Sequence, residues 1–453
     1  MNRPILKTTG SLSLRDGLRF FYLFMSAVFG VAASHAAYAV EYPMKPSADI
    51  IREGERLTLE RCVEIALQNQ PNMIAAKSNA LSAGSKVGQA EAAYYPQVDL
   101  STGYSKISTA PSPSVRSGTE ASDDYSMNAS LKQNIYDFGK TRLSVKVQEH
   151  NLEASRSDLE NTAIQTVFNV KEAYYGVLLA ARERDVASDT VKQFEQHLTQ
   201  AKGFYEAGTK PKFDVTKAEV DLSNARLNMI KAKNALKIAK VTLNSAMGVL
   251  AGPEYEIEDN LAFTPYNIAF DEALSKAFGN RPDLKSTVAK RRSAQESVEL
   301  SKKGYYPSLS GNAEYSRGGE KFPLQEGWNV GATLTIPIFS GFLTKYQVEE
   351  AKANLNASSA NEDGIKQTVF FDVQQAYLFL GQAQESVPVA EIAVKQAEEN
   401  LQIANGRYSA GVGSPIEVTD AQVSYITAKT AYIKALSDYK VAQATLEKVM
   451  GGR

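Results

Sequence analysis

The chain contains two related halves, and this repetition constrains its fold more than any other feature of the sequence. The segment Tyr94–Pro96 recurs as Tyr305–Pro307, 211 positions later. The segment Tyr205–Gly208 recurs as Tyr408–Gly411, 203 positions later. Repeats of this length predict two structurally similar halves that lie side by side around a common axis. Function is therefore to be sought in what the two halves enclose.

Residues 1–39 have the pattern of a secretory signal peptide. Basic residues precede the apolar run Phe20–Ala33, and Ala37–Ala39 offers a small-x-small cleavage site before Val40. A retained membrane anchor is the alternative, although the apolar run is short for a spanning helix. After cleavage, we expect a first structural repeat over 40–262 and a second over 263–453.

The composition narrows the classes of partner and the sources of stability. The net charge of the 453 residues is −1, which gives no reason to expect a nucleic-acid partner. Cys62 is the only cysteine, so an exported chain must be stabilised by packing without an internal disulfide. No stretch of 18 apolar residues follows the signal, so a membrane crossing would have to use strands.

Each half contains two segments in which apolar and polar residues alternate. They cover about 97–108 and 125–136 in the first half, and about 308–317 and 328–338 in the second. About ten residues of such alternation are enough for a tilted strand to span a bilayer. The polar face carries Ser, Asn, Asp, Gly and Thr, which suit a water-filled lumen; a small soluble hairpin is the alternative. The aromatic residues predicted to lie at the membrane interface are Tyr104, Tyr125, Tyr315 and Trp328.

The number of predicted strands has a consequence for assembly. Four strands cannot close a barrel, and lipid does not tolerate open sheet edges. If these strands span a membrane, several copies of the chain must share one barrel. The pattern therefore predicts a homo-oligomer.

After the strands, the apolar residues follow a period of seven over long segments. From Ala376 to Tyr408, they follow one another in alternating steps of four and three. This period predicts left-handed supercoiling of long helices, at about 139–207 and about 341–410. Such a helix could reach about 100 Å, which favours a projecting tube over an ordinary helical bundle. Each is followed by a second helix, at about 212–247 and about 415–450.

Two short turns connect the paired helices, and both contain glycine and proline. Gly208 and Gly411 supply left-handed caps, and Pro211 and Pro415 start the next helices. We expect both turns at the end of the helices that is remote from the strands. Pro388 falls inside the second long helix, where the seven-residue period continues, so we predict a kink there rather than a helix end.

These features resemble the TolC family of outer-membrane exit ducts, over nearly the whole mature chain from about Leu57 to Gly451. The most specific marks are the doubled layout, the Tyr-Tyr-Pro segments before the strands, Arg281–Leu284 and the Tyr-x-x-Gly turns. The resemblance implies a mainly α fold with a membrane β-barrel part, built from two tandem repeats with four strands per chain. Three chains would form a 12-stranded outer-membrane barrel on a left-handed coiled-coil α-barrel in the periplasm.

The resemblance also implies partners and a task. A periplasmic adaptor and an inner-membrane transporter would dock at the closed tip of the helices. Drugs or polypeptides would leave the cell through the bore, as part of a tripartite efflux pump or a type I secretion system. The duct itself would have no energy source.

Residues at the tip receive roles from the same resemblance. Tyr408 falls on the family's gating tyrosine, Asp214 on its acidic partner, and Glu417 and Asp420 on the two positions of an acidic ring. Glu417 and Asp420 are three residues apart on one helical face, and copies around an axis would place their carboxylates in a narrow mouth that favours cations. The alternative is an acidic pair that stabilises the start of a helix.

The position of the family's gating arginine corresponds to Gly413, so the closing contact lacks its cation. We expect Lys210 or Lys212 on the facing turn to supply that charge. The turns themselves are expected to dock the adaptor through Gly208, Thr209, Lys210, Gly411, Val412 and Gly413.

No group of residues has the arrangement of a catalytic centre. His150 and His197 lie 47 residues apart on one predicted helix, about 70 Å, and cannot share a metal ion or a proton. Cys62 has no histidine near it in sequence, and there is no phosphate-binding glycine loop. We expect no enzymatic activity, cofactor or metal. The rival interpretations are a periplasmic coiled-coil adaptor and a passive porin-like outer-membrane protein, which respectively lack membrane strands and long helices.

Overall fold

The same series of elements occurs twice along the chain. The computed structural model describes residues 51–108, 121–250 and 254–452, so the predicted signal peptide lies outside the described residues. They belong to a unit that spans Ser47–Arg453. The first series comprises β1 (Arg56–Leu57), α2 (Leu59–Asn69), α3 (Pro71–Glu91), η2 (Ala92–Tyr94), β2 (Gln97–Ile107), β3 (Ser122–Tyr136), α4 (Lys140–Glu206) and α5 (Lys212–Met247). The second comprises β4 (Glu256–Ile257), α6 (Phe270–Asn280), α7 (Pro282–Lys302), η3 (Lys303–Tyr305), β5 (Ser308–Gly319), β6 (Gln325–Thr335), α8 (Leu343–Ser409) and α9 (Pro415–Val449).

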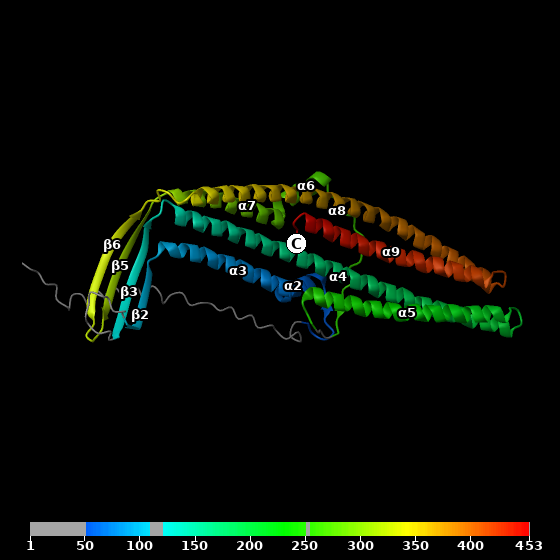
Figure 1. Cartoon of the computed structure of the whole chain (residues 1–453). Helices are drawn as coiled ribbons and strands as arrows, with labels where there is room; N and C mark the ends of the chain where they lie inside the picture. The colour runs from blue at the N-terminus through cyan, green and yellow to red at the C-terminus, as the bar shows by residue number, and fades with distance from the viewer. Residues whose placement is uncertain (1–50, 109–120, 251–253, 453) are drawn as a thin grey trace, which may run out of the picture. The chain divides into compact units, whose positions relative to one another are not determined.

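The two longest helices, α4 and α8, run from the strands to the tip, and the other helices pack against one or both of them (Figure 1). α4 and α8 each have 67 residues, about 100 Å at 1.5 Å per residue. The predicted seven-residue period buries Ala376, Leu380 and Val387 of α8 in the main core. α8 continues through Pro388 to the tip.

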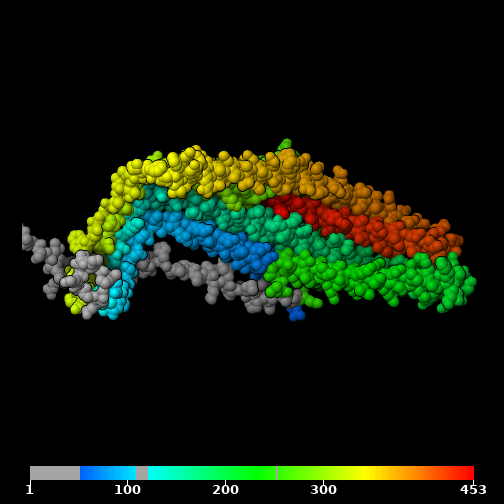
Figure 2. All heavy atoms as spheres, viewed as in Figure 1, coloured from blue at the N-terminus to red at the C-terminus, as the bar shows by residue number. Residues whose placement is uncertain are grey.

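Towards the tip, four helices form a layer in the order α5, α4, α9, α8. α4 packs against both α5 and α9, and α9 packs against α8. Figure 2 shows α8, in yellow to orange, along one edge and α5, in green, along the opposite edge, with α9 in red between them. Towards the strands, α3 packs against α4, and α7 packs against both α4 and α8. α5 and α8 are therefore the outer helices of the layer.

The four long strands form one antiparallel sheet in the order β2-β3-β5-β6. Large apolar side chains on these strands are exposed in the single chain, with Leu100 at 64% and Trp328 at 79%. Among the described residues, the outer edges of β2 and β6 pair with no further strand. The short strands β1 and β4, one from each half, pair in parallel and join the two halves.

One strand is shorter than the alternating pattern predicts. The pattern extends to residue 338, but β6 ends at Thr335. Pro337 has no backbone N–H to donate to a neighbouring strand, which accounts for the early end. Ile336 and Ile338, which the pattern placed on one strand face, lie beyond the strand and are exposed.

The main core lies where helices of the two halves meet. Cys62 on α2 is fully buried there, and burial raises the pKa of its thiol to about 12. The Tyr174 hydroxyl on α4 donates to the carbonyl of Glu258 at 2.6 Å, and the Tyr439 hydroxyl on α9 donates to that of Thr264 at 2.7 Å. These bonds connect the segment between β4 and α6 to both helical hairpins, the first formed by α4 and α5 and the second by α8 and α9.

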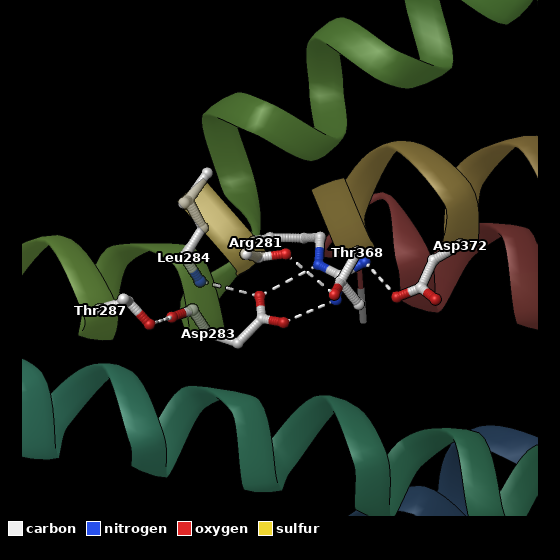
Figure 3. Close-up of polar contacts among 7 residues, drawn as sticks. Arg281, Asp283, Leu284, Thr287, Thr368 and Asp372 are labelled. Atoms are coloured by element: carbon white, nitrogen blue, oxygen red, sulfur yellow. Dashed lines mark hydrogen bonds and ion pairs between the residues drawn. The ribbon is translucent and has the colours of Figure 1, made fainter. Parts of the chain in front are cut away.

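A charged joint connects the start of α7 to α8 (Figure 3). The Arg281 guanidinium donates to both carboxylate oxygens of Asp283, at 3.0 Å and 2.6 Å, and to Asp372 of α8 at 2.8 Å. Burial opposes ionisation of Asp283, but the charge and hydrogen bonds of Arg281 outweigh it and lower the pKa of that carboxyl. The segment singled out by the family resemblance is thus a structural connection between helices.

Candidate functional site

The two helical turns at the tip have the same backbone structure. After α4, the N–H of Gly208 bonds the carbonyl of Tyr205 at 2.9 Å, and φ of Gly208 is +70°. After α8, the N–H of Gly411 bonds the carbonyl of Tyr408 at 3.0 Å, and φ of Gly411 is +80°. Glycine adopts this left-handed conformation at little cost, so both turns form as their sequences predict.

Tyr408 is enclosed between the two hairpins. Its side chain is fully buried, and its ring centroid lies 5.0 Å from that of His197 and 5.6 Å from that of Phe204, both on α4. The Nζ of Lys210 lies 5.6 Å from the same ring centroid. Tyr408 therefore connects the end of α8 to the first hairpin.

Polar contacts across the same interface involve both turns. Gln200 Nε2 donates to the Ser409 hydroxyl at 2.9 Å. Lys210 Nζ donates to the Gly413 carbonyl at 3.3 Å. Of the two lysines that we expected to replace the missing cation, Lys210 reaches the facing turn, whereas Lys212 is exposed and makes no described side-chain contact with that turn.

A second set of polar contacts lies further from the turns. The Thr419 hydroxyl on α9 donates to Asp221 Oδ2 on α5 at 3.0 Å, and Asp221 also binds Lys217 at 3.0 Å. Gln422 of α9 donates to Gln193 of α4. The two contacts between α9 and the first hairpin, Thr419–Asp221 and Gln422–Gln193, extend the interface by several helical turns, and motif reasoning did not single them out.

Buried ionisable groups surround Tyr408. Burial, together with the negative charge of Asp214, raises the pKa of the Tyr408 hydroxyl, which therefore stays neutral. Asp214, the predicted acidic partner, is 5% exposed. Burial also lowers the pKa of His197 below its ordinary value. His197 was not predicted as a site residue.

The position of the missing arginine has no room for a side chain. A Cβ atom on Gly413 would lie 2.7 Å from Tyr408 N and 2.9 Å from Arg407 C. Gly413 is buried, so it is not part of the exposed tip surface to which we assigned it. The cation on this hairpin is instead Arg407, whose Nε binds Glu417 Oε2 at 3.3 Å.

The two predicted ring residues and four of the six predicted docking residues face solvent in the single chain. Glu417 has a side chain that is 48% exposed, and Asp420 is exposed one helical turn further along α9. The exposed residues among those predicted to dock the adaptor are Gly208, Thr209, Gly411 and Val412, whereas Lys210 is partly buried. The acidic pair and the apex of each turn are therefore accessible to another copy, a partner or solvent.

The four aromatic residues assigned to the membrane interface form two pairs at one end of the sheet. Tyr104 lies opposite Tyr125 in the β2–β3 register, and Tyr315 lies opposite Trp328 in the β5–β6 register. The ring centroids of Tyr104 and Tyr125 are 5.2 Å apart. Phe322, in the β5–β6 loop, lies 5.2 Å from Tyr125 and extends the aromatic group.

Two searches of the described residues concern other classes of site. No described helix combines the length and the apolar character that a membrane span requires. No cluster of three or more His, Cys, Asp or Glu side chains within the described ranges has the arrangement of a metal site.

Comparison with known proteins assigns the chain. A family model described as outer membrane efflux protein matches residues 62–249 and 273–452. The chain belongs to the outer membrane efflux protein family. Protein CyaE of Bordetella pertussis is 25% identical over 442 residues, which cover 94% of this chain and 89% of the relative. The outer membrane protein TolC of Vibrio cholerae is 21% identical over 425 residues, covering 90% and 94%.

A solved structure has the same fold. The crystal structure of the Campylobacter jejuni CmeC outer membrane channel matches with a TM-score of 0.77 at 20% identity, covering 87% of this chain and 85% of that one. The TolC-family resemblance and the predicted mainly α fold with a strand part are thereby confirmed. This member of the outer membrane efflux protein family is an outer-membrane exit duct for efflux or secretion, in a family of transport proteins. The adaptor and porin alternatives are set aside.

Proposed function

We propose that the chain is one protomer of a homotrimeric duct, which receives cargo from a periplasmic adaptor and an inner-membrane transporter and conducts it across the outer membrane. The main support for an assembly of copies is that one protomer has two edges, each with an outer helix or strand that lacks a neighbour on one side among the described residues. The chain has two outer helices, α5 and α8, and two outer strands, β2 and β6. A ring of copies would pair each edge with its complement.

The strand edges have the polarity that ring closure needs. Three antiparallel pairings separate β2 from β6, so the two edge strands run in opposite directions. β6 of one copy can therefore continue the antiparallel sheet onto β2 of the next. Closure would satisfy the edge N–H and C=O groups that lipid cannot satisfy. Three copies of four strands give the twelve strands that the family resemblance implies.

The helical edges carry apolar residues suited to the same contact. On α5, Phe213, Val220 and Leu227 are at least half exposed and follow one another at seven-residue spacing. On α8, the exposed apolar residues include Phe371, Leu378, Val389, Ile392 and Ile403. Seven-residue spacing places side chains on one seam of a supercoiled helix pair. We infer that α5 of one copy packs against α8 of the next.

An edge substitution tests this assembly directly. Replacing Val220 and Leu227 by glutamate should abolish the trimer, because two charges would be buried at the seam. The measurement is the heat-modifiable trimer band of protein extracted from the outer-membrane fraction. Leu250→Glu is the matched control, because Leu250 is 96% exposed and lies outside α5 and α8. A trimer that survives the double substitution, or a wild-type chain that is a monomer without affinity for detergent, contradicts the proposal.

The tip would act as the periplasmic gate of this duct. Tyr408 and Asp214 hold the hairpins in the packed arrangement, and the carboxylates of Glu417 and Asp420 from three copies form a ring at the entrance. Such a ring favours cations. In reconstituted channels, Glu417→Ala with Asp420→Ala should lower cation selectivity and divalent block. Asp363→Ala, an exposed carboxylate on α8 remote from the tip, should change neither, and an unaltered double variant refutes the ring.

The adaptor would dock on the exposed apex of the two turns. Bulky residues at Gly208 or Gly411 should abolish export, but both positions have a positive φ that a side chain would strain. Thr209→Trp and Val412→Trp test the surface without that strain, since both residues are exposed. Loss of export with an intact trimer supports docking, and loss of the trimer argues against it. We infer no enzymatic activity, because transport needs only the bore.

A further inference from the structure

Two rings in contact at the interface of the hairpins each carry a buried polar atom without a partner in the described part of the chain. Nε2 of His197 and the hydroxyl of Tyr408 are both buried and have no hydrogen-bond partner among the described residues. Their rings lie 5.0 Å apart, and the residues are 8% and 0% exposed. An unpaired buried polar group destabilises the state that contains it. Separation of the hairpins would expose both polar groups to water, which would supply the hydrogen bonds that they lack in the packed tip.

His197 differs from Tyr408 in that it can gain a charge near neutral pH. The ordinary pKa of histidine is roughly 6.5, so small changes of environment decide its charge. In the packed tip, a protonated imidazole would be a buried cation with no hydrogen-bond acceptor at Nε2. Such a charge is costly, whereas the same charge on separated hairpins would be hydrated.

The charged groups that face His197 come from several elements. On α5, the carboxylates of Asp221 and Asp214 favour the charged imidazole, and the ammonium of Lys217 opposes it. In the turn after α4, Lys210 places a further cation over the ring of Tyr408. α8 contributes the neutral Tyr408 itself. Burial outweighs the two carboxylates, because the pKa of His197 lies below its ordinary value.

We propose that His197 is a proton-sensitive positioning residue of the tip: as a neutral ring it holds Tyr408 and keeps the hairpins packed, and protonation separates them. Its effect on opening of the bore rests on the proposed function of the tip as a gate. The residue acts through Tyr408 and touches no cargo in this role. The inference stands on the packing of the two rings and on their unpaired atoms.

The direction of the pH effect follows from linkage. Because the pKa of His197 is lower in the packed state, the packed state binds the proton less well than the separated state. Its contribution to packing is fully present above the ordinary histidine pKa, roughly 6.5, and is lost as pH falls below that value. One proton changes the ratio of packed to separated hairpins by at most about tenfold per pH unit.

Distances between spin labels on the two turns test the proposal. Cysteines at Thr209 and Val412 would carry the labels, and both positions are exposed on different turns. The native Cys62 is fully buried, so it stays unlabelled. Labelled chains are mixed with excess unlabelled chains so that only the distance within one chain is measured. We expect one short distance at about pH 7.5 and a growing longer population towards about pH 5.5.

The variants separate a titrating role from a packing role. His197→Phe keeps a neutral ring, and His197→Gln keeps a neutral polar side chain; both should hold the short distance across the pH range. His150→Gln should retain the wild-type response, because His150 lies on the same helix but far from the tip, where its half-buried ring contacts Glu153. A wild-type distance that is independent of pH, a neutral variant that still responds, or two neutral variants that are already separated at about pH 7.5 would each overturn the proposal.

This measurement does not depend on conduction, so it is distinct from a test of the duct. Single-channel recordings on the same trimers supply the second result. If the distances respond to pH and the open probability does not, His197 moves the hairpins but the tip is not the gate. If both respond in wild type and neither responds in His197→Phe, then the sensor and the gate are the same structure.

Discussion

Tyr205 and Tyr408 occupy equivalent positions in the two repeats, yet their environments are opposite. Tyr205 is 46% exposed, whereas Tyr408 is fully buried. The turns that follow them have the same hydrogen bonds, and Gly208 and Gly411 have similar positive φ angles. Since the local structure is the same, the difference comes from the surface that the opposite hairpin presents.

That surface changes at three repeat-equivalent positions. The first hairpin carries His197, Phe204 and Lys210, and all three contact the Tyr408 ring. The second hairpin has Asn400, Arg407 and Gly413 at the corresponding places, 203 positions later. Lys210 and Gly413 are themselves equivalent and form a hydrogen bond with one another, in which only Lys210 contributes a side chain. The two turns therefore share one backbone structure, but only the first hairpin has side chains that enclose the tyrosine of the other hairpin.

The joints at the ends of α5 and α9 also share a backbone structure but differ in their side-chain contacts. Gly248 and Gly451 follow the second helix of each hairpin with φ of +74° and +78°. A Cβ atom on Gly248 would lie 2.9 Å from backbone atoms of Asn69–Gln70, and one on Gly451 would lie 2.8 Å from those of Asn280–Arg281, in each case within the same half. In the first half, Gln70 donates to carbonyls of α5 at 3.2 Å and 3.3 Å. In the second, Arg281 binds two carboxylates. The backbone contact is duplicated, and only the second joint is ionic.

Truncation of the two equivalent tyrosines should show the largest difference in stability between the repeats. Tyr408→Ala removes a fully buried ring and should destabilise the packed tip by about 3–5 kcal/mol, as for other buried aromatics. Tyr205→Ala should cost about 0.5 kcal/mol or less, as for surface substitutions. Hydrogen exchange of the amides in both turns measures this local stability. Equal protection in the two variants would mean that Tyr408 is not the residue that holds the hairpins together.

Substitutions at the two joints should show a smaller difference in protein stability than those at the two tyrosines. Arg281→Met leaves Asp283 and Asp372 without their cation and should destabilise the protein by about 2–3 kcal/mol, a value reduced for the partial exposure of Asp372. Gln70→Met removes neutral hydrogen bonds and should cost about 1 kcal/mol. Thermal unfolding of purified trimers, followed by circular dichroism, compares the two variants. A greater loss for Gln70→Met would contradict the assignment of the ionic joint.

Acid should reduce the difference between wild type and Arg281→Met. The pKa of Asp283 is lowered in the folded protein, so its contribution is present above the ordinary aspartate pKa, about 3.9, and is lost as pH falls through the lower folded value. The gap between the two unfolding temperatures should therefore close in that range. The gap for Gln70→Met should stay constant, because glutamine does not titrate. A gap for Arg281→Met that is unchanged in acid would exclude the ionic explanation.

Periodicity made most of the fold predictable from the sequence, because the long helices repeat apolar residues with a period of seven and the strands alternate apolar and polar residues. The tip turns were predictable for the same reason that they are alike, since glycine and proline act locally. Periodicity and turn chemistry did not distinguish the two tyrosines, because both stand in the same Tyr-x-Ala-Gly motif. The family resemblance singled out Tyr408, but its burial depends on contacts between the hairpins. The lack of space at Gly413 and the pairing of Arg407 with Glu417 also depend on tertiary packing.

Alanine at the two turn glycines should have the smallest effect and should restore the equivalence of the repeats. Gly208 and Gly411 both have a positive φ, and a Cβ atom on either would meet no atom within 4 Å. Backbone strain is then the only penalty, so each variant should lose about 1 kcal/mol of turn stability, measured by hydrogen exchange. Asparagine, which tolerates this conformation, should recover part of it in both turns. If Gly411→Ala costs much more than Gly208→Ala, the strain reaches Tyr408, and the turn and the buried ring form one cooperative unit instead of two independent ones.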